Sequence, residues 1–299
     1  MSRISDWRKA TVQRLLGVDL PQMAAQLAHT ENWQVNLDEI ERGVVAQREL
    51  LRRERDGIPG LAERLAALRL TSAYAAVFDD PEPLISVRIA SFSKTEELID
   101  VAVRSVLQQS YPRFELIIVN DGPNPATRAA IEKLNDSHIY YEEFPERNVY
   151  PFDPIARWRV AGSPGMNRAA DLARGAWIAP LDDDDAFTPD HLDKLLELAP
   201  SEKVELAYGA LLQRNIVTGS EVRIWSSPPT ISKFSFQGAI YLRLLHGIFR
   251  YDETSWMVAE PGDWNLIRRM SAAGVTMRAT PDVVATMFHV PYNLKEPGE

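Results

Sequence analysis

Cysteine is absent from the 299-residue chain, which excludes disulfide bonds and metal sites built on thiolates. No apolar run is long enough to span a bilayer, and the opening stretch MSRISDWRKATVQRLLG lacks the apolar segment of a secretory signal. We therefore expect a cytoplasmic protein, with peripheral attachment at the inner membrane face as the alternative. Basic charge is also scarce, since 33 Lys and Arg against 42 Asp and Glu give a net charge of −9. This balance argues against nucleic-acid binding, which depends on Lys and Arg contacts to phosphates.

The remaining composition is that of a folded protein, with 45% hydrophobic and 25% charged residues. Residues 1–80 show the apolar spacing of helices, interrupted at DGIPG (56–60). They end in FDDPEP (78–83), whose prolines cannot continue a helix. We interpret residues 1–80 as a helical extension that packs on the main domain or on a second subunit, as in a homo-oligomer, and residues 81–299 as the main domain.

From residue 84 onward, strand-like and helix-like segments alternate. The stretches LISVRIA (84–90), FELIIVN (114–120) and AWIAPLD (176–182) are typical of buried strands, and the segments between them have helical apolar spacing. Such alternation predicts an α/β fold with a mostly parallel sheet flanked by helices.

Polar residues follow three of these strands directly. They are Ser91, Asp121 and the acidic run at 182–185. The carboxyl ends of parallel strands meet at one edge of the sheet, and ligands bind at that edge. We therefore expect these three sites to line one crevice.

The acidic run, in PLDDDDAFTPDHL, has two interpretations. Neighbouring carboxylates in a crevice repel one another unless a cation compensates them, and Mg²⁺ or Mn²⁺ binds one or two carboxylates together with substrate phosphates. That interpretation predicts a metal-diphosphate site. The alternative is a solvated acidic loop before the next helix, with Thr188 or Asp190 as the N-cap. The cap explains Thr188 and Asp190 but not the four acids before them.

Taken in order, the segments LISVRIASFSK, FELIIVNDGP, GMNRAADLARG and AWIAPLDDDDAFTPDHL resemble the GT-A fold glycosyltransferases of family 2. The likeness covers residues 84–197 and resumes near the C-terminus. It implies a Rossmann-like sheet in which residues 84–200 bind a nucleotide sugar and residues 201–299 bind the acceptor. It also implies transfer of a sugar from a nucleotide-diphosphate donor, UDP or dTDP, to a hydroxyl of a carbohydrate or another acceptor, with inversion.

On the donor side, the resemblance implies that Ala90, Ser91 and Phe92 lie along the nucleotide base. It also implies that Asp121 reads the base. Asn120 stands where the family usually has a first aspartate and carries no charge.

The donor sugar and its phosphates are assigned by the resemblance to the helix MNRAADLARG, where Asn167 lies near them. Met166 replaces the arginine that usually precedes this position. Arg159, or else Arg157, in the upstream loop is expected to reach the diphosphate instead.

The resemblance also implies the metal ligands, because the proline that follows the acidic run sets the register of the family's acidic motif on it. In that register Asp184 is the direct ligand of Mn²⁺ or Mg²⁺, while Asp182 and Asp183 contact the ribose, the metal or its water. Asp185 orients another group or caps the next helix. His289, at the end of a late apolar strand, is either a further metal ligand or a structural residue.

An inverting transfer needs a carboxylate on the acceptor side to take the proton of the attacking hydroxyl. The segment EPGDWNLIRRMSAAG (260–274) resembles the family motif that supplies it, which makes Asp263 the base and Glu260 the substitute candidate. Gly262 stands where an acid is usual. The alternative role of Asp263 is the N-cap of the helix that begins there.

Two other functions remain open. A sugar-phosphate nucleotidyltransferase would use the same crevice, but no Gly-rich phosphate loop with a following Lys or Arg lies near the first strand. A non-catalytic nucleotide-sugar-binding scaffold would account for Asn120 and Gly262, whereas the intact Asp184 and Asp263 favour an enzyme.

Overall fold

The computed structural model describes residues 43–53, 55–199 and 203–289. By its internal contacts the chain forms two units, Met1–Arg55 and Asp56–Glu299. In the first unit residues 43–53 are helical, and Glu49 pairs with Arg52 and Arg53 at 2.9 and 3.1 Å. The part of the predicted extension before residue 43 lies outside the described residues. The second unit contains the sheet and its helices.

Four strands form the parallel half of the sheet, in the order β3-β2-β1-β4. Their bounds are Ile85–Ser91 (β1), Phe114–Asn120 (β2), Ile139–Glu143 (β3) and Trp177–Asp182 (β4). β1 and β2 are almost wholly buried, as β-branched strands covered on both faces should be. The register pairs Ser91 with Asn120 and Ala90 with Asp182, so the ends of β2, β1 and β4 lie side by side.

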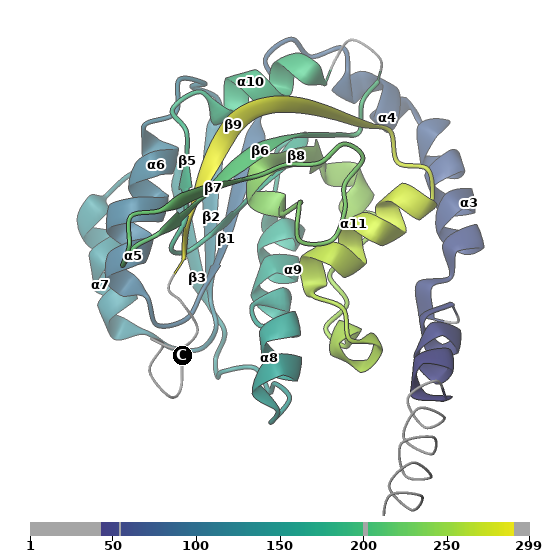
Figure 1. The fold of residues 1–299 in the computed structure, drawn as a ribbon. Coiled ribbons are helices and arrows are strands. Elements are labelled where there is room, and N and C mark those ends of the chain that lie inside the picture. The colour runs from purple at the N-terminus through teal and green to yellow at the C-terminus, as the bar shows by residue number, and fades with distance from the viewer. Residues whose placement is uncertain (1–42, 54, 200–202, 290–299) are drawn as a thin grey trace, which may run out of the picture. The chain divides into compact units, whose positions relative to one another are not determined.

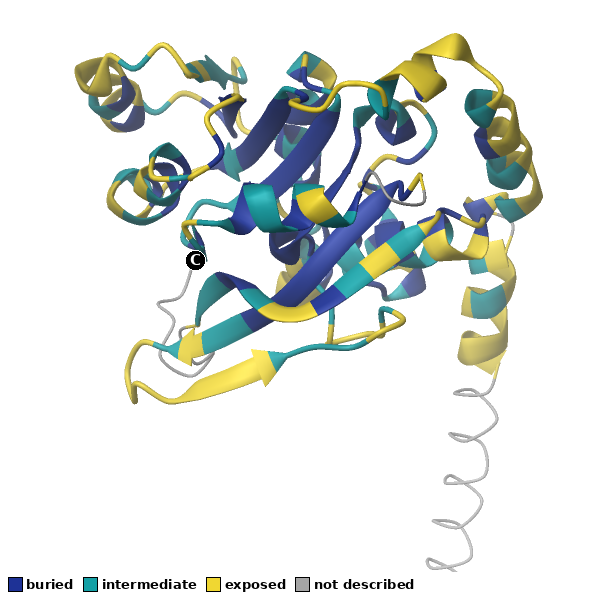
Figure 2. Ribbon diagram, turned by 90° about the horizontal axis from the view of Figure 1, so that it is seen from above, coloured by how far each residue is buried: buried dark blue, intermediate teal, exposed yellow. Residues whose placement is uncertain are grey.

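The other half of the sheet is mixed and continues from β4 through β8, β6, β9 and β5, with β7 paired to β6. The bounds are Ala186–Phe187 (β5), Leu206–Asn215 (β6), Glu221–Ile224 (β7), Ala239–Leu242 (β8) and Met277–His289 (β9). β6 and β9 are parallel, and the other pairs in this half are antiparallel. Figure 2 shows that the inner strands are buried, whereas β7 is largely exposed. The α/β class is confirmed, and the acidic run lies where the two halves meet.

Helices flank the sheet (Figure 1). After β1, α5 (Thr95–Glu97) continues through a π-helical turn, η1 (Leu98–Val103), into α6 (Arg104–Leu107). The other helices that follow β2 are α7 (Pro125–Leu134), α8 (Pro154–Val160), α9 (Ser163–Leu172), α10 (His191–Leu198) and α11 (Gly262–Ala272), with 3₁₀ turns η3 (Phe236–Gly238), η4 (Arg243–Gly247) and η5 (Ser255–Val258). α9 packs on β1 and β2, where a Cβ on Gly165 would lie 3.0 Å from the Ala90 Cβ. Gly165 therefore allows the close approach of α9 to β1.

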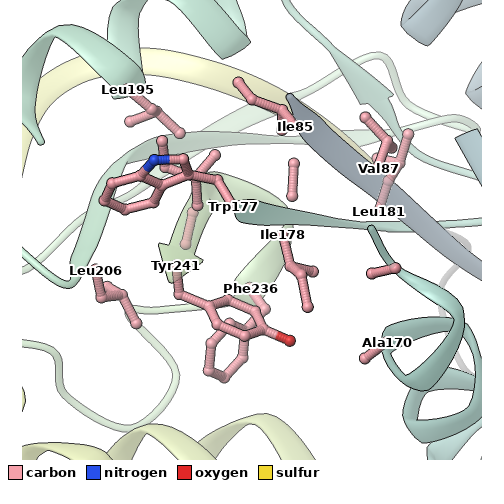
Figure 3. Close-up of a cluster of buried hydrophobic side chains, with 14 of the residues drawn as sticks. Ile85, Val87, Ala170, Trp177, Ile178, Leu181, Leu195, Leu206, Phe236 and Tyr241 are labelled. Atoms are coloured by element: carbon pink, nitrogen blue, oxygen red, sulfur yellow. The ribbon is translucent and has the colours of Figure 1, made fainter. Parts of the chain in front are cut away.

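The core beneath the site is built on β4 and β8. Trp177, Phe236 and Tyr241 are buried there, and Figure 3 shows them in one apolar cluster with Leu195 of α10 and Ala170 of α9. The rings of Phe236 and Tyr241 meet nearly edge to face, with centroids 5.9 Å apart. This packing fixes η3, which precedes β8, against the sheet.

Two helices before the sheet, α3 (Ile58–Arg69) and α4 (Ser72–Val77), belong to the same unit as the sheet. Gly57 has φ 53°, a left-handed conformation that glycine adopts readily, and it separates α3 from the helix before it. Leu65 of α3 is buried in the core. Within the described ranges, no helix combines the length and the apolar character needed to cross a membrane.

Candidate active site

The acidic run turns away from the end of β4, and its carboxylates accept hydrogen bonds from different groups. Gln237 Nε2 donates to Asp182 and, at 3.1 Å, to Asp185, which also accepts from Phe288 N–H at 2.9 Å. Ser91 Oγ donates to Asp183 at 2.9 Å. Lys94 Nζ donates to Asp184 at 2.5 Å. These contacts join β1, β4, β9 and the segment before β8. The predicted meeting of the first and fourth strand ends at one edge is therefore confirmed.

Negative charge accumulates in this run, in which Asp185 is buried and the other three aspartates are partly buried. Burial raises the pKa of Asp182 well above its ordinary value, and the charges of Asp185 and Asp263 raise it further. Burial also raises the pKa of Asp183 to about 6. For Asp185, burial and then the charge of Asp184 raise the pKa to about 7. A cation bound here would relieve this repulsion.

The alternative interpretation, an acidic loop before a helix capped by Thr188 or Asp190, is confirmed only for the position of the cap, since Asp190 occupies the N-cap of α10. α10 begins after Asp190, whose side chain makes no capping hydrogen bond. Thr188 Oγ1 donates to Asp190 at 2.8 Å and to Val284 O at 3.1 Å. Among the described contacts, none of the four carboxylates accepts a hydrogen bond from the first turn of α10.

The end of β1 lies beside the exit of β2. Ser91 O accepts from Asp121 N–H at 2.7 Å, so the third predicted strand exit also reaches this edge. Phe92 is 40% exposed, and the Arg147 guanidinium lies 3.8 Å from its ring centroid. This pair offers the kind of flat surface on which a base stacks. Ala90 packs its side chain against Gly165 of α9 instead.

Asp121 is buried, and most of its acceptor positions are filled. Oδ1 accepts from Asn148 N–H at 2.9 Å and from Asn148 Nδ2 at 2.6 Å, and Oδ2 accepts from Tyr150 OH at 2.7 Å. A carboxylate offers about four such positions, so about one remains. Asn120 donates through Nδ2 to Gly122 O at 2.8 Å, and its buried Oδ1 has no partner among the described residues.

The residues predicted to lie near the donor sugar and its phosphates differ in their hydrogen-bond partners. Asn167 exchanges hydrogen bonds with the backbone of Tyr251, through Nδ2 to O and from N–H to Oδ1, both at 3.0 Å. Arg157 donates to two backbone carbonyls at 3.2 and 3.0 Å, whereas Arg159 has no hydrogen-bond or ion-pair partner within the described ranges. Both arginines lie on α8 rather than in the predicted loop, because Asp153 caps this helix by accepting from Ala156 N–H at 2.8 Å. Asn167 therefore holds the segment at Tyr251 in place.

Asp263 lies in the first turn of α11, and the N-cap alternative for it is wrong because Pro261 occupies the N-cap position. Its carboxylate accepts from groups of other segments. Oδ2 accepts from Ser235 Oγ at 2.5 Å and from Phe236 N–H at 3.1 Å, and Oδ1 accepts from Tyr251 OH at 2.8 Å. By the same count of four positions, Oδ1 retains one for a further donor.

A buried arginine contacts the tyrosine that donates a hydrogen bond to Asp263. Arg88, in the middle of β1 and 1% exposed, donates through Nη2 to Tyr251 OH at 3.0 Å. Burial and the charge of Asp263 raise the pKa of Tyr251 well above its ordinary value, so the phenol stays protonated and donates to Asp263. Neither Arg88 nor Tyr251 was predicted from the sequence. The available signal was a charged residue inside the apolar strand LISVRIA.

Residues 235–237, which we name the bridge segment, connect the acidic run with Asp263. Its first two residues donate to Asp263, and Gln237 donates to Asp182 and Asp185. Asp182 and Asp263 are thereby held close enough for the charge of Asp263 to raise the pKa of Asp182. This segment was not predicted from the sequence, in which its signal is a pair of polar side chains in FSFQGAIYL.

The remaining candidates lie at the margins. His289 is exposed at the end of β9, next to Phe288, whose N–H binds Asp185. Glu260 is buried and ion-paired with Arg268 at 2.7 Å. A carboxylate in such a pair is poorly suited to act as the substitute base.

The sequence model "Glycosyl transferase family 2" matches residues 86–261. The chain belongs to this family. It is 35% identical over 117 residues to the putative teichuronic acid biosynthesis glycosyltransferase TuaG of Bacillus subtilis (strain 168), covering 39% of this chain and 42% of that protein. It is 30% identical over 152 residues to the Escherichia coli UDP-Glc:alpha-D-GlcNAc-diphosphoundecaprenol beta-1,3-glucosyltransferase WfaP, covering 50% of this chain and 53% of that protein.

Among solved structures, S. aureus TarS 1-349 in complex with UDP-GlcNAc has a TM-score of 0.52 with this chain at 15% identity. The match covers 72% of this chain and 59% of that one. At this identity the likeness shows the fold, which is of the GT-A type. The chain spans 42% and 53% of the lengths of TuaG and WfaP.

The donor set of the acidic run fits a hard divalent cation. Among the described residues, no group of three acidic or His side chains converges closely enough to enclose a metal. Mg²⁺ and Mn²⁺ do not require such a cage, because they commonly take one or two carboxylates together with phosphates and water. Asp184 is the carboxylate suited to this role, since its side chain is 30% exposed and its one described partner is a lysine.

Proposed function

We propose that the chain is a metal-dependent glycosyltransferase that moves a sugar from a UDP or dTDP donor to an acceptor hydroxyl with inversion. The observation that carries this proposal is the bridge segment, which holds the acidic run and Asp263 in one site. Family membership supports the reaction class. A uridine donor is supported by the names of the relative WfaP, which specifies UDP-Glc, and of the TarS complex with UDP-GlcNAc.

Asp263 acts as the base in this proposal. Three donors hold its carboxylate, and the open position on Oδ1 accepts the proton of the attacking hydroxyl. Residues 201–299, which include Asp263, form the acceptor side. Residues 84–200 bind the donor, with the remaining acceptor position of Asp121 facing the imide N–H of the base and Phe92 beside the base.

On the donor side, Asp184 and Asp182 hold the divalent cation, with His289 as a further ligand from the end of β9. When bound, Mn²⁺ or Mg²⁺ would neutralise the leaving diphosphate as a Lewis acid. Ser91 orients Asp183 by donating to it, and Asp183 contacts the ribose. Arg159, which lies on α8 and has no partner among the described residues, reaches the diphosphate in this proposal. No protein nucleophile is needed.

The test is calorimetric binding of UDP and of dTDP with and without Mn²⁺, on the wild type and on Asp184→Asn. We expect tight binding of one nucleotide that requires Mn²⁺ and is lost in the variant. Release of nucleoside diphosphate from the matching sugar donor then reports turnover. Tight binding without turnover would identify a scaffold, and no binding of either nucleotide would contradict the proposal.

We also propose that the protein is cytoplasmic and attaches peripherally to the inner membrane face. Val149, Phe152, Ile155 and Trp158, on and before α8, are 99%, 95%, 58% and 66% exposed. Side chains of this kind insert at the lipid–water interface, and the acceptor named for WfaP is linked to a diphospholipid carrier. Co-sedimentation with anionic vesicles should fall for a Phe152→Ser, Trp158→Ser double variant. Equal binding of the variant and the wild type would contradict this attachment.

A further inference from the structure

Lys94 follows β1 and points its ammonium group into the acidic run. Nζ lies 2.5 Å from Asp184 Oδ2, and the two side chains are 39% and 30% exposed. The negative charges of Asp184, Asp183 and Asp182 all act on this ammonium group. Among the described residues, Lys94 is the one cation paired with the run. Lys94 is therefore paired with Asp184, the carboxylate that is best placed to hold a divalent cation.

We propose that Lys94 is a built-in counter-ion that competes with the divalent cation for Asp184 and transfers to the diphosphate of the donor when that cation binds. This inference rests on the proposed function. Charge balance supports it. Without ligands, the ammonium group compensates part of the negative charge of the run. A dication at Asp184 makes this compensation unnecessary, while the donor brings new negative charge to the same place.

The side chain of Lys94 suits such a transfer. Lysine carries a compact, rotatable charge on a flexible stem, so it can exchange one anionic partner for another nearby. Its backbone is fixed at the start of α5, because Leu98 N–H donates to Lys94 O at 2.9 Å. The ammonium group can therefore move while its anchor stays in place. By contrast, the partners of Asp182 and Asp185 include Gln237 Nε2, which brings no charge to a diphosphate.

Two effects of opposite sign follow for Lys94→Met, which keeps the length of the stem and removes the charge. Without donor, Mn²⁺ should bind more tightly by about fivefold, because a partly exposed ion pair no longer has to break. At saturating Mn²⁺, UDP should bind more weakly by about tenfold, because a charge-assisted contact to the diphosphate is lost. A purely structural role of Lys94 would weaken both kinds of binding.

The experiment measures free Mn²⁺ by electron paramagnetic resonance during titration of the full chain, and UDP binding by calorimetry in saturating Mn²⁺. Lys194→Met is the matched control, because Lys194 pairs with Asp190 at 2.8 Å on α10. We expect the opposite shifts for Lys94→Met, both reduced for Lys94→Arg and absent for Lys194→Met. Unfolding midpoints show that each variant is folded.

The inference is overturned if Lys94→Met binds Mn²⁺ equally well or more weakly than the wild type. If the wild type nevertheless binds Mn²⁺ and UDP and turns over the sugar donor, only the inference about Lys94 fails. The proposed function then stays intact. If neither Mn²⁺ nor UDP binds the wild type or Lys94→Met, both the inference and the proposed function fail.

Discussion

At the scale of single residues, hydrogen bonding distinguishes two carboxylates of the site. Asp184 has one described partner, an ammonium group that a ligand can displace. Asp263 is held by donors from two other segments, around Ser235 and around Tyr251. A displaceable partner suits a ligand of a cation, whereas a fixed orientation suits a base that must meet a hydroxyl in one geometry. In the proposed function the same residue type would therefore serve two tasks.

Asp263→Asn tests the role of the base. Asparagine keeps the shape of the side chain but cannot take up the proton, so turnover should fall by about 10²- to 10⁴-fold. Affinity for the nucleoside diphosphate should stay within about twofold of the wild type, since the proposed function assigns Asp263 to the acceptor side and base removal acts on the transition state. The measurement is the rate of nucleoside diphosphate release from the sugar donor, together with calorimetric binding.

The control for this variant is Asp100→Asn. Asp100 pairs with Arg104 in an exposed pair, with side chains 64% and 61% exposed, and it should leave the rate unchanged. Wild-type turnover in Asp263→Asn would show that another group removes the proton.

His191 provides a pH-dependent contribution to stability that is separate from the site. Its ring is buried and stacks on Phe187 with centroids 3.6 Å apart. Burial lowers its pKa to about 3, and its Nε2 has no partner among the described residues. Because the folded pKa lies below the unfolded value, the unfolded chain takes up a proton first as the pH falls. This term therefore stabilises the fold above about pH 6.5 and is progressively lost towards about pH 3.

His191→Phe should remove this dependence while keeping an aromatic ring against Phe187. Between pH 7 and pH 5 the wild type should lose about 2 kcal/mol more unfolding free energy than the variant. Urea denaturation at the two pH values measures the difference. An equal loss in both proteins would mean that His191 is protonated in the folded state.

At the scale of elements, a buried carboxylate helps to attach α3 and α4 to the sheet. Glu205, which precedes β6 and is 0% exposed, accepts from Arg69 Nε at 2.8 Å, from Tyr74 OH at 3.0 Å and from Thr276 N–H at 2.7 Å. Three elements therefore share its charge. A buried carboxylate that loses its cation is left poorly compensated.

Arg69→Ala should therefore lower the unfolding free energy by about 2 kcal/mol, less than for a fully buried pair because the arginine side chain is 35% exposed. UDP affinity should not change, because Arg69 is remote from the acidic run in the fold. Arg104→Ala, which breaks an exposed pair, serves as the comparison and should change stability by less than about 0.5 kcal/mol. If the two variants were equally stable, Glu205 would be compensated without Arg69.

Sequence pattern predicted the parts of the site that follow from local rules. The acidic run and Ser91 lie at strand ends, and parallel strands bring such ends to one edge whatever the rest of the fold does. The contacts of Gln237 and Phe288 with the run could not be predicted in this way, because they depend on how η3 and β9 pack in the mixed half of the sheet. No periodicity specifies that β9 returns to lie parallel to β6. The contact of Arg88 could not be predicted for a related reason, since its partner Tyr251 is distant in sequence.

At the scale of the whole molecule, the described residues of the two units differ in how far their apolar side chains are buried. In the unit Asp56–Glu299 the described residues enclose one large apolar cluster that includes Leu65 of α3. In the other unit, the helix at residues 43–53 leaves apolar side chains uncovered, with Val45 and Leu50 58% and 60% exposed. Exposed apolar side chains that recur along one helix favour association with a partner surface. A second copy of this chain is the partner we expect.

A chain that begins at Arg53 tests this expectation while keeping Asp56, whose Oδ2 pairs with Arg268 Nη1 at 2.6 Å. Light scattering should give the mass of a dimer for the full chain and of a monomer for the shortened one. UDP affinity in saturating Mn²⁺ and the unfolding midpoint at low concentration should be the same, because the core and the site belong to the second unit. If the shortened chain remained a dimer, the interface would lie on the catalytic unit. If it lost UDP binding, residues 1–52 would be needed to form the site, and the extension would not be a separate unit.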